Sequence, residues 1–203
     1  QAARASGDLH VVRVSAIGAA ADAPTDNGRL HHVSDEELKA SGLRYTILRP
    51  HFFMQNVMMS IPTIVENGQM YWGMGDGSLG MIDVRDIADS AVALLLHGGH
   101  EGETLTPTGR ESITFHEAAK TLGEVLGRDV TYVAVPYEAV RQSILEAGWG
   151  EWAAQVMYDY SKAYAEGWGD FANGDVESVT GRPARSFEEF AREVFAGAVP
   201  AVA

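Results

Sequence analysis

The stretches LHVVRVS, residues 9–15, and RYTILR, residues 44–49, decide the fold of this chain. Both are short, rich in β-branched and apolar side chains, and bounded by glycine or proline, which is typical of buried strands. Between them, Leu30, Val33 and Leu38 recur at near-helical spacing. A strand, a helix and a second strand joined by short loops predict a βαβ unit with two parallel strands in one sheet.

The rest of the chain adds further strands and then becomes more helical. We expect Asn27-Gly28 in the loop before the first helix, because this dipeptide favours turns. Residues 54–65 predict a helix that Pro62 kinks or splits. Further expected elements are short strands at 69–72, 81–83, 103–106 and 130–135, helices at 83–96 and 137–167 (the latter divided at 148–150), and helices opened by capping boxes at Thr114–Glu117 and Ser186–Glu189.

Composition excludes several classes of function. The 203 residues are 46% hydrophobic, enough for a substantial core, and no apolar run reaches the ~18 residues that cross a bilayer. Without such a run we expect no membrane partner. The net charge of -13 repels nucleic-acid backbones, so we expect no nucleic-acid partner either. The absence of cysteine excludes disulfides and thiol nucleophiles and fits a cytoplasmic protein. No motif has the spacing of a metal site.

The first seven residues, QAARASG, predict the last turn or two of a helix that has no beginning. A native chain rarely opens inside a helix and without methionine. We therefore expect that this sequence lacks an upstream segment.

Five segments resemble NmrA-like proteins and related atypical short-chain dehydrogenase/reductases. In chain order they are residues 11–18 (VVRVSAIG), 37–43 (ELKASGL), 45–50 with 53–56 (YTILRP and FMQN), 82–88 (IDVRDIA), and 180–183 with 187–190 (TGRP and FEEF). Together they span nearly the whole chain.

The resemblance implies an α/β fold: the C-terminal part of a Rossmann-like parallel sheet with helices, plus a small, mostly helical substrate-side region. It divides the chain into a partial NAD(P)-binding domain, residues 1–98, and a substrate-side region, residues 99–203, packed closely on it. The family's glycine-rich phosphate loop, on its first strand-to-helix turn, has no counterpart here, and on the order of 80 preceding residues are missing. Gly73-x-Gly75-x-Gly77 lies between two predicted strands, so we do not expect it to hold phosphate.

The resemblance also implies NAD(P)H as cofactor and a small-molecule substrate. Two loops that follow parallel strands would flank the nicotinamide: Ser15, Ala16 and Ile17 after the first strand, and Pro50, His51, Phe52 and Phe53 after the second. The expected substrate-binding residues are Met54, Asn56, Tyr71, Trp72 and Met81. The aromatic and methionine side chains of this region line an apolar pocket or belong to the core, and we expect core for about half of them.

A catalytic residue is harder to assign. Tyr158 and Lys162 have the spacing of the reductase pair, but they lie far downstream of the family position, so we expect ordinary surface residues. His31 and His32 stand near that position, where either a general acid or a pair of exposed histidines fits the pattern. Asp83 and Asp86 fit helix capping better than catalysis.

Three functions remain open. The first is an NAD(P)H-dependent oxidoreductase acting on a small apolar, quinone or carbonyl acceptor. The second is a non-catalytic NAD(P)-sensing regulator, since this sequence lacks the family's proton relay. The third is a truncated chain that binds no dinucleotide and covers its exposed sheet edge by forming a homo-oligomer.

Overall fold

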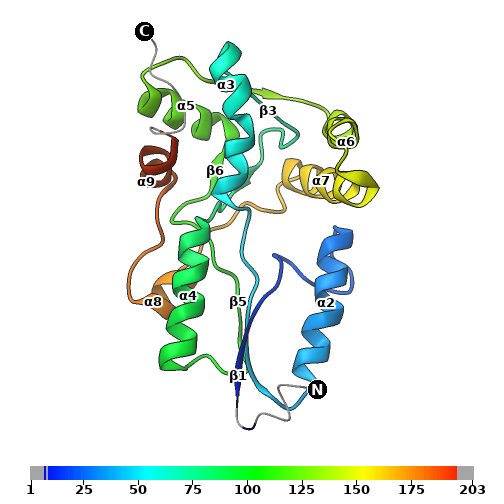
Figure 1. Ribbon diagram of the computed structural model, residues 1–203, viewed down its shortest axis with the longest axis vertical. Helices are drawn as coiled ribbons and strands as arrows, with labels where there is room; N and C mark the ends of the chain where they lie inside the picture. Colours follow the sequence, from blue (N-terminus) through cyan, green and yellow to red (C-terminus); the bar gives the residue numbers. More distant parts are fainter. Residues whose placement is uncertain (1–6, 8, 196–203) are drawn as a thin grey trace.

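The computed structural model describes residue 7 and residues 9–195. The first half of the chain is built around a parallel sheet. Strand β1 (His10–Val14) runs beside β2 (Arg44–Leu48), with His10 opposite Arg44 and Val14 opposite Leu48, and β5 (Thr104–Leu105) pairs with the far side of β2. Helix α2 (Asp26–Lys39) connects β1 to β2 (Figure 1). The predicted βαβ unit is confirmed.

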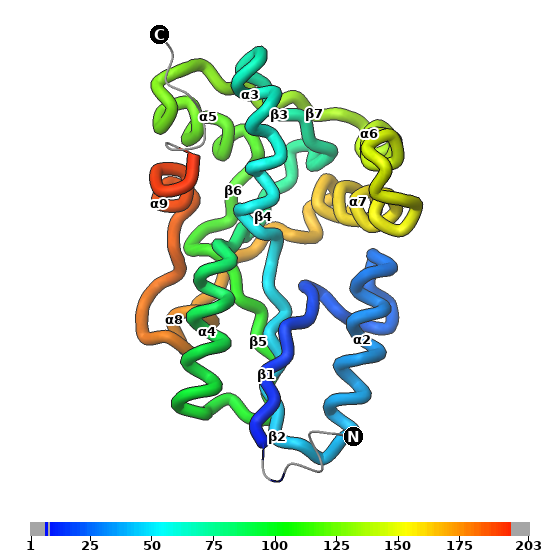
Figure 2. The backbone as a smooth tube through the Cα atoms, viewed as in Figure 1, coloured from blue at the N-terminus to red at the C-terminus, as the bar shows by residue number. Residues whose placement is uncertain are grey.

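The two faces of this sheet are covered by different helices. Val12 and Leu48 pack against Leu94 of α4 (Val84–His97) on one face. Arg13, which alternates with Val12 along β1, points to the other face and reaches α2. Figure 2 shows the strands between α2 and α4. The α4 face of the sheet thus carries Val12 and Leu48, whereas the α2 face combines the apolar Ile47 with the charged Arg13.

Two predicted boundaries were wrong. Asn27-Gly28 lies in the first turn of α2, because the side chain of Thr25 accepts a hydrogen bond from the Gly28 amide and caps the helix one turn earlier. Residues 81–83 do not form a strand: Ile82 makes an isolated bridge with Phe53, and β4 (Ser78–Leu79) precedes it.

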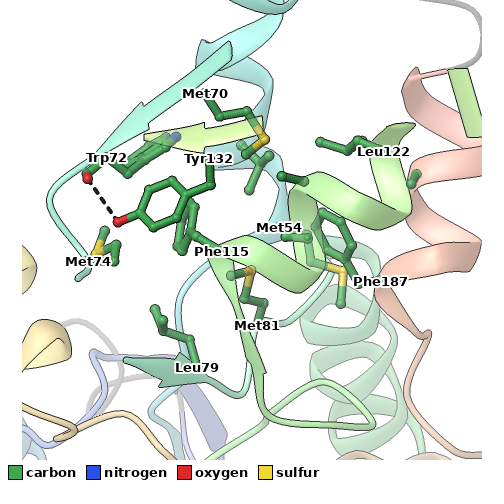
Figure 3. Packing of buried hydrophobic residues seen from close by; sticks show 14 of the residues in the cluster. Met54, Met70, Trp72, Met74, Leu79, Met81, Phe115, Leu122, Tyr132 and Phe187 are labelled. Carbon is green, nitrogen blue, oxygen red and sulfur yellow. Dashed lines mark hydrogen bonds between the residues drawn. The ribbon is translucent and has the colours of Figure 1, made fainter. Parts of the chain in front are cut away.

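A second group of strands and helices contains the main hydrophobic core. Strand β3 (Gln69–Trp72) runs parallel to β7 (Thr131–Ala134), and β4 pairs antiparallel with β6 (Ile113–Thr114). The surrounding helices are η1 (Met54–Ser60), α3 (Ile61–Asn67), α5 (Phe115–Leu126), α6 (Tyr137–Glu146), α7 (Gly150–Ala165), α8 (Asp175–Thr180), α9 (Phe187–Phe190) and the π-helical η2 (Ala191–Phe195). Pro62 stands where η1 gives way to α3, and both capping boxes are confirmed. Figure 3 shows methionine, aromatic and leucine side chains of these elements packed together.

The glycines at 73–77 join β3 to β4 and lie against helix α7. A Cβ at Gly77 would come 2.0 Å from the backbone oxygen of Tyr164, and one at Gly75 would come 3.3 Å from the Cβ of Ala165. Because Gly75 and Gly77 have no side chains, the loop can pack closely against α7.

Several sequence-based expectations concern the limits of these parts. The expected helix end at residues 1–6 lies outside the described residues. The division at residue 98 stays a prediction, and β5, which lies beyond it, extends the β1–β2 sheet. None of the helices among the described residues has the length and apolar character needed to span a membrane.

Candidate functional site

A cavity of about 430 Å³ opens at the carboxyl ends of β1 and β2. Its floor comes from the two loops that follow these strands, in the position where open α/β sheets bind ligands. The loops contribute all seven residues predicted to contact a cofactor: Ser15, Ala16, Ile17, Pro50, His51, Phe52 and Phe53. The structure thus brings them together, although their role as cofactor contacts stays a prediction.

Helix α7 closes the cavity from the opposite side. Val156, Met157, Tyr160 and Tyr164 line it, and the rings of Tyr160 and Tyr164 stack with their centroids 5.7 Å apart. The sequence reasoning missed this wall, because α7 lies more than a hundred residues beyond the floor. The available signal was the tyrosine-rich segment YDYSKAY at residues 158–164.

Tyr160 contributes a phenolic hydroxyl to the cavity wall. It accepts a hydrogen bond from the side-chain amide of Asn27, at 3.0 Å. Burial raises the pKa of Tyr160, and the hydrogen bonds from Asn27 and Thr25 oppose that rise only in part. The phenol therefore stays protonated at neutral pH, and as the neutral form it can donate to a ligand.

His31 also lines the cavity and is held in its neutral form. Its Nδ1 lies 3.4 Å from the Arg13 guanidinium, which can only donate, so the ring proton belongs on Nε2. Burial, followed by the positive charge of Arg13, lowers the pKa of His31. His32 instead lies beside Glu36, at 3.9 Å, and is not among the cavity residues.

A buried carboxylate lies beneath the floor. Asp35 is fully buried and accepts hydrogen bonds from Arg13 (2.7 Å), Ser15 (2.9 Å) and Arg49 (3.0 Å). Burial alone would raise the pKa of Asp35, but these donors outweigh it and hold the pKa below its usual value. Asp35 therefore ties α2 to the ends of both strands and fixes the side chain of Ser15.

His51 lines the cavity but offers it no free nitrogen. Its Nδ1 accepts from the Phe52 amide at 2.7 Å, which places the ring proton on Nε2, 3.0 Å from the Gly169 carbonyl. Burial lowers the pKa of His51 to about 4. His51 thus braces the second loop against the segment that follows α7.

The residues predicted to bind substrate fall in three places. Asn56 lines the cavity. Tyr71 and Trp72 line a second cavity, of about 370 Å³. The predictions for Met54 and Met81 need correction: both are buried in the core, 2% and 1% exposed, and Figure 3 shows them beside Phe115. Neither methionine is among the residues that line the two cavities.

The remaining catalytic alternatives lie outside the cavity. Tyr158 packs edge-on against Tyr137 of α6, with ring centroids 5.2 Å apart. Asp83 caps α4 by accepting from the Arg85 amide, and Asp86 accepts from the Arg185 amide, so both acids are structural. Across residues 9–195, no cluster of histidine and carboxylate side chains is arranged to hold a metal ion.

Known proteins resemble this chain over almost its full length. The NAD(P)H azoreductase of Xenophilus azovorans is 38% identical over 194 residues, which cover 94% of this chain and 67% of the relative. The chain belongs to the NmrA-like family of atypical short-chain dehydrogenase/reductases. No protein-family model matches it.

Solved structures agree on the NmrA-like fold. The NADPH-dependent quinone oxidoreductase of Escherichia coli, in complex with NADPH, superposes with a TM-score of 0.85 at 24% identity, over 96% of this chain and 68% of that one. The transcriptional regulator NmrA in complex with NAD gives a TM-score of 0.68 at 17% identity, over 96% of this chain and 66% of that one. The NmrA-like chain described here thus spans about two-thirds of the length of these relatives.

Proposed function

We propose that the cavity on β1 and β2 is the acceptor side of an NAD(P)H-dependent reductase that acts on flat, apolar acceptors such as quinones. The observation that carries the proposal is the cavity itself. It places an apolar floor, with Ala16, Ile17 and Phe52, in one cavity with the neutral phenol of Tyr160, at the ligand-binding end of a parallel sheet. The names of the azoreductase and quinone oxidoreductase relatives support the same class of reaction.

The described residues fit the nicotinamide end of a dinucleotide. The residues that would hold it are Ser15 to Ile17 and Pro50 to Phe53, whose loops form the floor of the cavity. When bound, NAD(P)H supplies a hydride. The loop after β1 does not fit a phosphate group in the same way. Gly18 in this loop packs against the indole of Trp168, and a Cβ added at Gly18 would lie 2.3 Å from Cζ2 of that ring. This loop therefore packs against an aromatic ring, and we place no phosphate on it.

Tyr160 has the properties needed for the acceptor oxygen. Reduction of a quinone places negative charge on oxygen, and a positioned hydrogen-bond donor stabilises that charge as it develops. The Asn27 amide holds the Tyr160 oxygen, so the phenolic hydrogen is directed away from Asn27. Because its pKa is raised, Tyr160 acts as a hydrogen-bond donor, and the proton taken up by the product comes from solvent.

The first test is NAD(P)H oxidation by the purified chain with menadione, together with dinucleotide affinity by calorimetry. We expect saturable turnover. Binding without turnover for any quinone or carbonyl would favour a dinucleotide-binding regulator instead, the class to which the NAD-bound transcriptional regulator NmrA belongs. Neither binding nor turnover would refute both, and would leave a chain that takes a different ligand.

We also propose that the chain, when expressed alone, forms a homo-oligomer. Among residues 9–195, β1 has a strand partner only on its β2 side. On the two flanking helices, Leu95 and Leu96 of α4 are 60% and 71% exposed, and Val33 of α2 is 65% exposed. An open strand edge and exposed apolar side chains both favour association. Sedimentation velocity that shows a single monomer at all concentrations would contradict this proposal.

A further inference from the structure

The second cavity, of about 370 Å³, lies beside the first and shares a wall residue with it. It is bounded by η1 and α3, by Trp72 of β3, and by the first turns of α6. Met157 of α7 lines both cavities, so its thioether side chain stands between them. Methionine is unbranched and adaptable, which suits a partition that a ligand can displace.

A second wall also runs past both cavities. Asn56 lines the first and Met59 the second, and they are three residues apart in the 3₁₀ helix η1. At three residues per turn these side chains lie one above the other on one ridge. The ridge of η1 and the side of α7 at Met157 therefore form continuous walls along which an elongated molecule fits.

The two cavities differ in the polar groups they offer. In the second cavity, Ser60 accepts from the Trp72 indole at 2.8 Å, Thr63 donates to the Gln69 carbonyl at 2.7 Å, and Ser143 donates to the Val140 carbonyl at 2.9 Å. These hydroxyls are already engaged within the protein. A polar substituent on a ligand would find few hydrogen-bond partners there and would lose those it had in water, whereas an unsubstituted ring has no hydrogen bonds to lose.

We infer that the second cavity is a subsite for the distal ring of a two-ring aromatic acceptor, whose reacting ring lies beside Tyr160, with Met157 as the specificity-determining residue between them. The inference rests on the proposed function, because the first cavity must hold the reacting ring. It adds a substrate class: acceptors in which an unsubstituted aryl group extends from the ring that is reduced.

The test uses a substitution that fills only the second cavity. Ala139, on the exposed side of α6, lines that cavity, so Ala139→Trp places an indole in it. Ser143→Trp, one helical turn further along, is an independent second variant. Gln142→Trp is the matched control, because Gln142 is an exposed residue of the same helix that is not among the cavity residues.

Binding is measured first by calorimetry without dinucleotide, with 4-phenylphenol and 4-methylphenol as probes. We expect the wild type and Gln142→Trp to bind 4-phenylphenol at least about tenfold more tightly, since a phenyl ring buries more apolar surface than a methyl group. Ala139→Trp and Ser143→Trp should bring the two affinities near parity. If both variants keep the wild-type preference, the subsite does not exist.

Turnover separates this inference from the proposed function. The kcat/KM ratio of phenyl-1,4-benzoquinone to methyl-1,4-benzoquinone, with NADPH, should fall about tenfold in Ala139→Trp and stay unchanged in Gln142→Trp. If the binding pattern holds but no quinone is reduced, the subsite stands and the proposed reaction fails. If quinones are reduced but Ala139→Trp keeps the phenyl preference, the reaction stands and the subsite fails.

Discussion

At the scale of single residues, two buried ionisable groups, Asp35 and His51, shape the cavity through hydrogen bonds within the protein. Asp35 joins Arg13, Ser15 and Arg49 beneath the floor. Both ring nitrogens of His51 form hydrogen bonds with backbone groups. Each group holds its charge state through burial and local hydrogen bonds, so each makes stability depend on pH in a definite direction.

Replacing Asp35 with asparagine should lower the free energy of unfolding by about 3 kcal/mol at pH 7, because two arginines lose their buried anion. The folded pKa of Asp35 lies below the usual value of 3.8, so its stabilisation is present at neutral pH and is lost as the pH falls through the folded pKa. Urea unfolding at several pH values measures both effects. Glu37→Gln, at an exposed position of the same helix, is the control and should change neither.

His51 predicts a loss of stability in mild acid. The unfolded chain takes up a proton near pH 6.5, whereas the folded protein resists protonation down to about pH 4. The free energy of unfolding should therefore fall by on the order of 3 kcal/mol between these values. In His51→Gln this part of the pH dependence should disappear. An unchanged slope in His51→Gln, with His116→Gln as the exposed control, would rule out His51 as its source.

At the scale of elements, the sequence predicted individual strands, helices and caps better than the contacts between distant elements. Strand β1, strand β2, the split at Pro62 and both capping boxes follow from local patterns, since each depends on neighbours within a few residues. The start of α2 was misplaced because the turn-forming dipeptide at 27–28 outweighed Thr25, whose capping bond is visible only in three dimensions. The role of the glycines at 73–77 depends on a helix about ninety residues away, which no local pattern reveals.

Gly77 should not tolerate a side chain. A Cβ there would meet the backbone oxygen of Tyr164 at 2.0 Å, and neither the loop nor α7 can move without disturbing the core. We expect Gly77→Ala to lower the free energy of unfolding by about 2 kcal/mol. Gly174→Ala is the control, because a Cβ at that position meets nothing within 4 Å. Equal thermal midpoints for the two variants would contradict the packing role.

At the scale of the whole molecule, the cavity exists because distant parts of the chain meet. Its floor comes from residues 15–17 and 50–53, which the family resemblance located, and the polar side chains of Asn27, His31 and Tyr160 come from α2 and α7. Of these, only His31 could be proposed from the sequence. Tyr160 has no recognisable spacing in the sequence, and the direction of a side chain on α7 depends on how that helix packs. Met54 and Met81 were misassigned for the same reason: an apolar side chain looks alike in a core and in a pocket.

The most direct measurement is steady-state NADPH oxidation with menadione by the wild type, Tyr160→Phe and Tyr158→Phe. Tyr160 points into the cavity, whereas Tyr158 packs on Tyr137. We expect kcat to fall about 100-fold in Tyr160→Phe, because the donor to the developing oxygen charge is lost, and to stay unchanged in Tyr158→Phe. Full activity in Tyr160→Phe, or an equal loss in both variants, would contradict the proposed site.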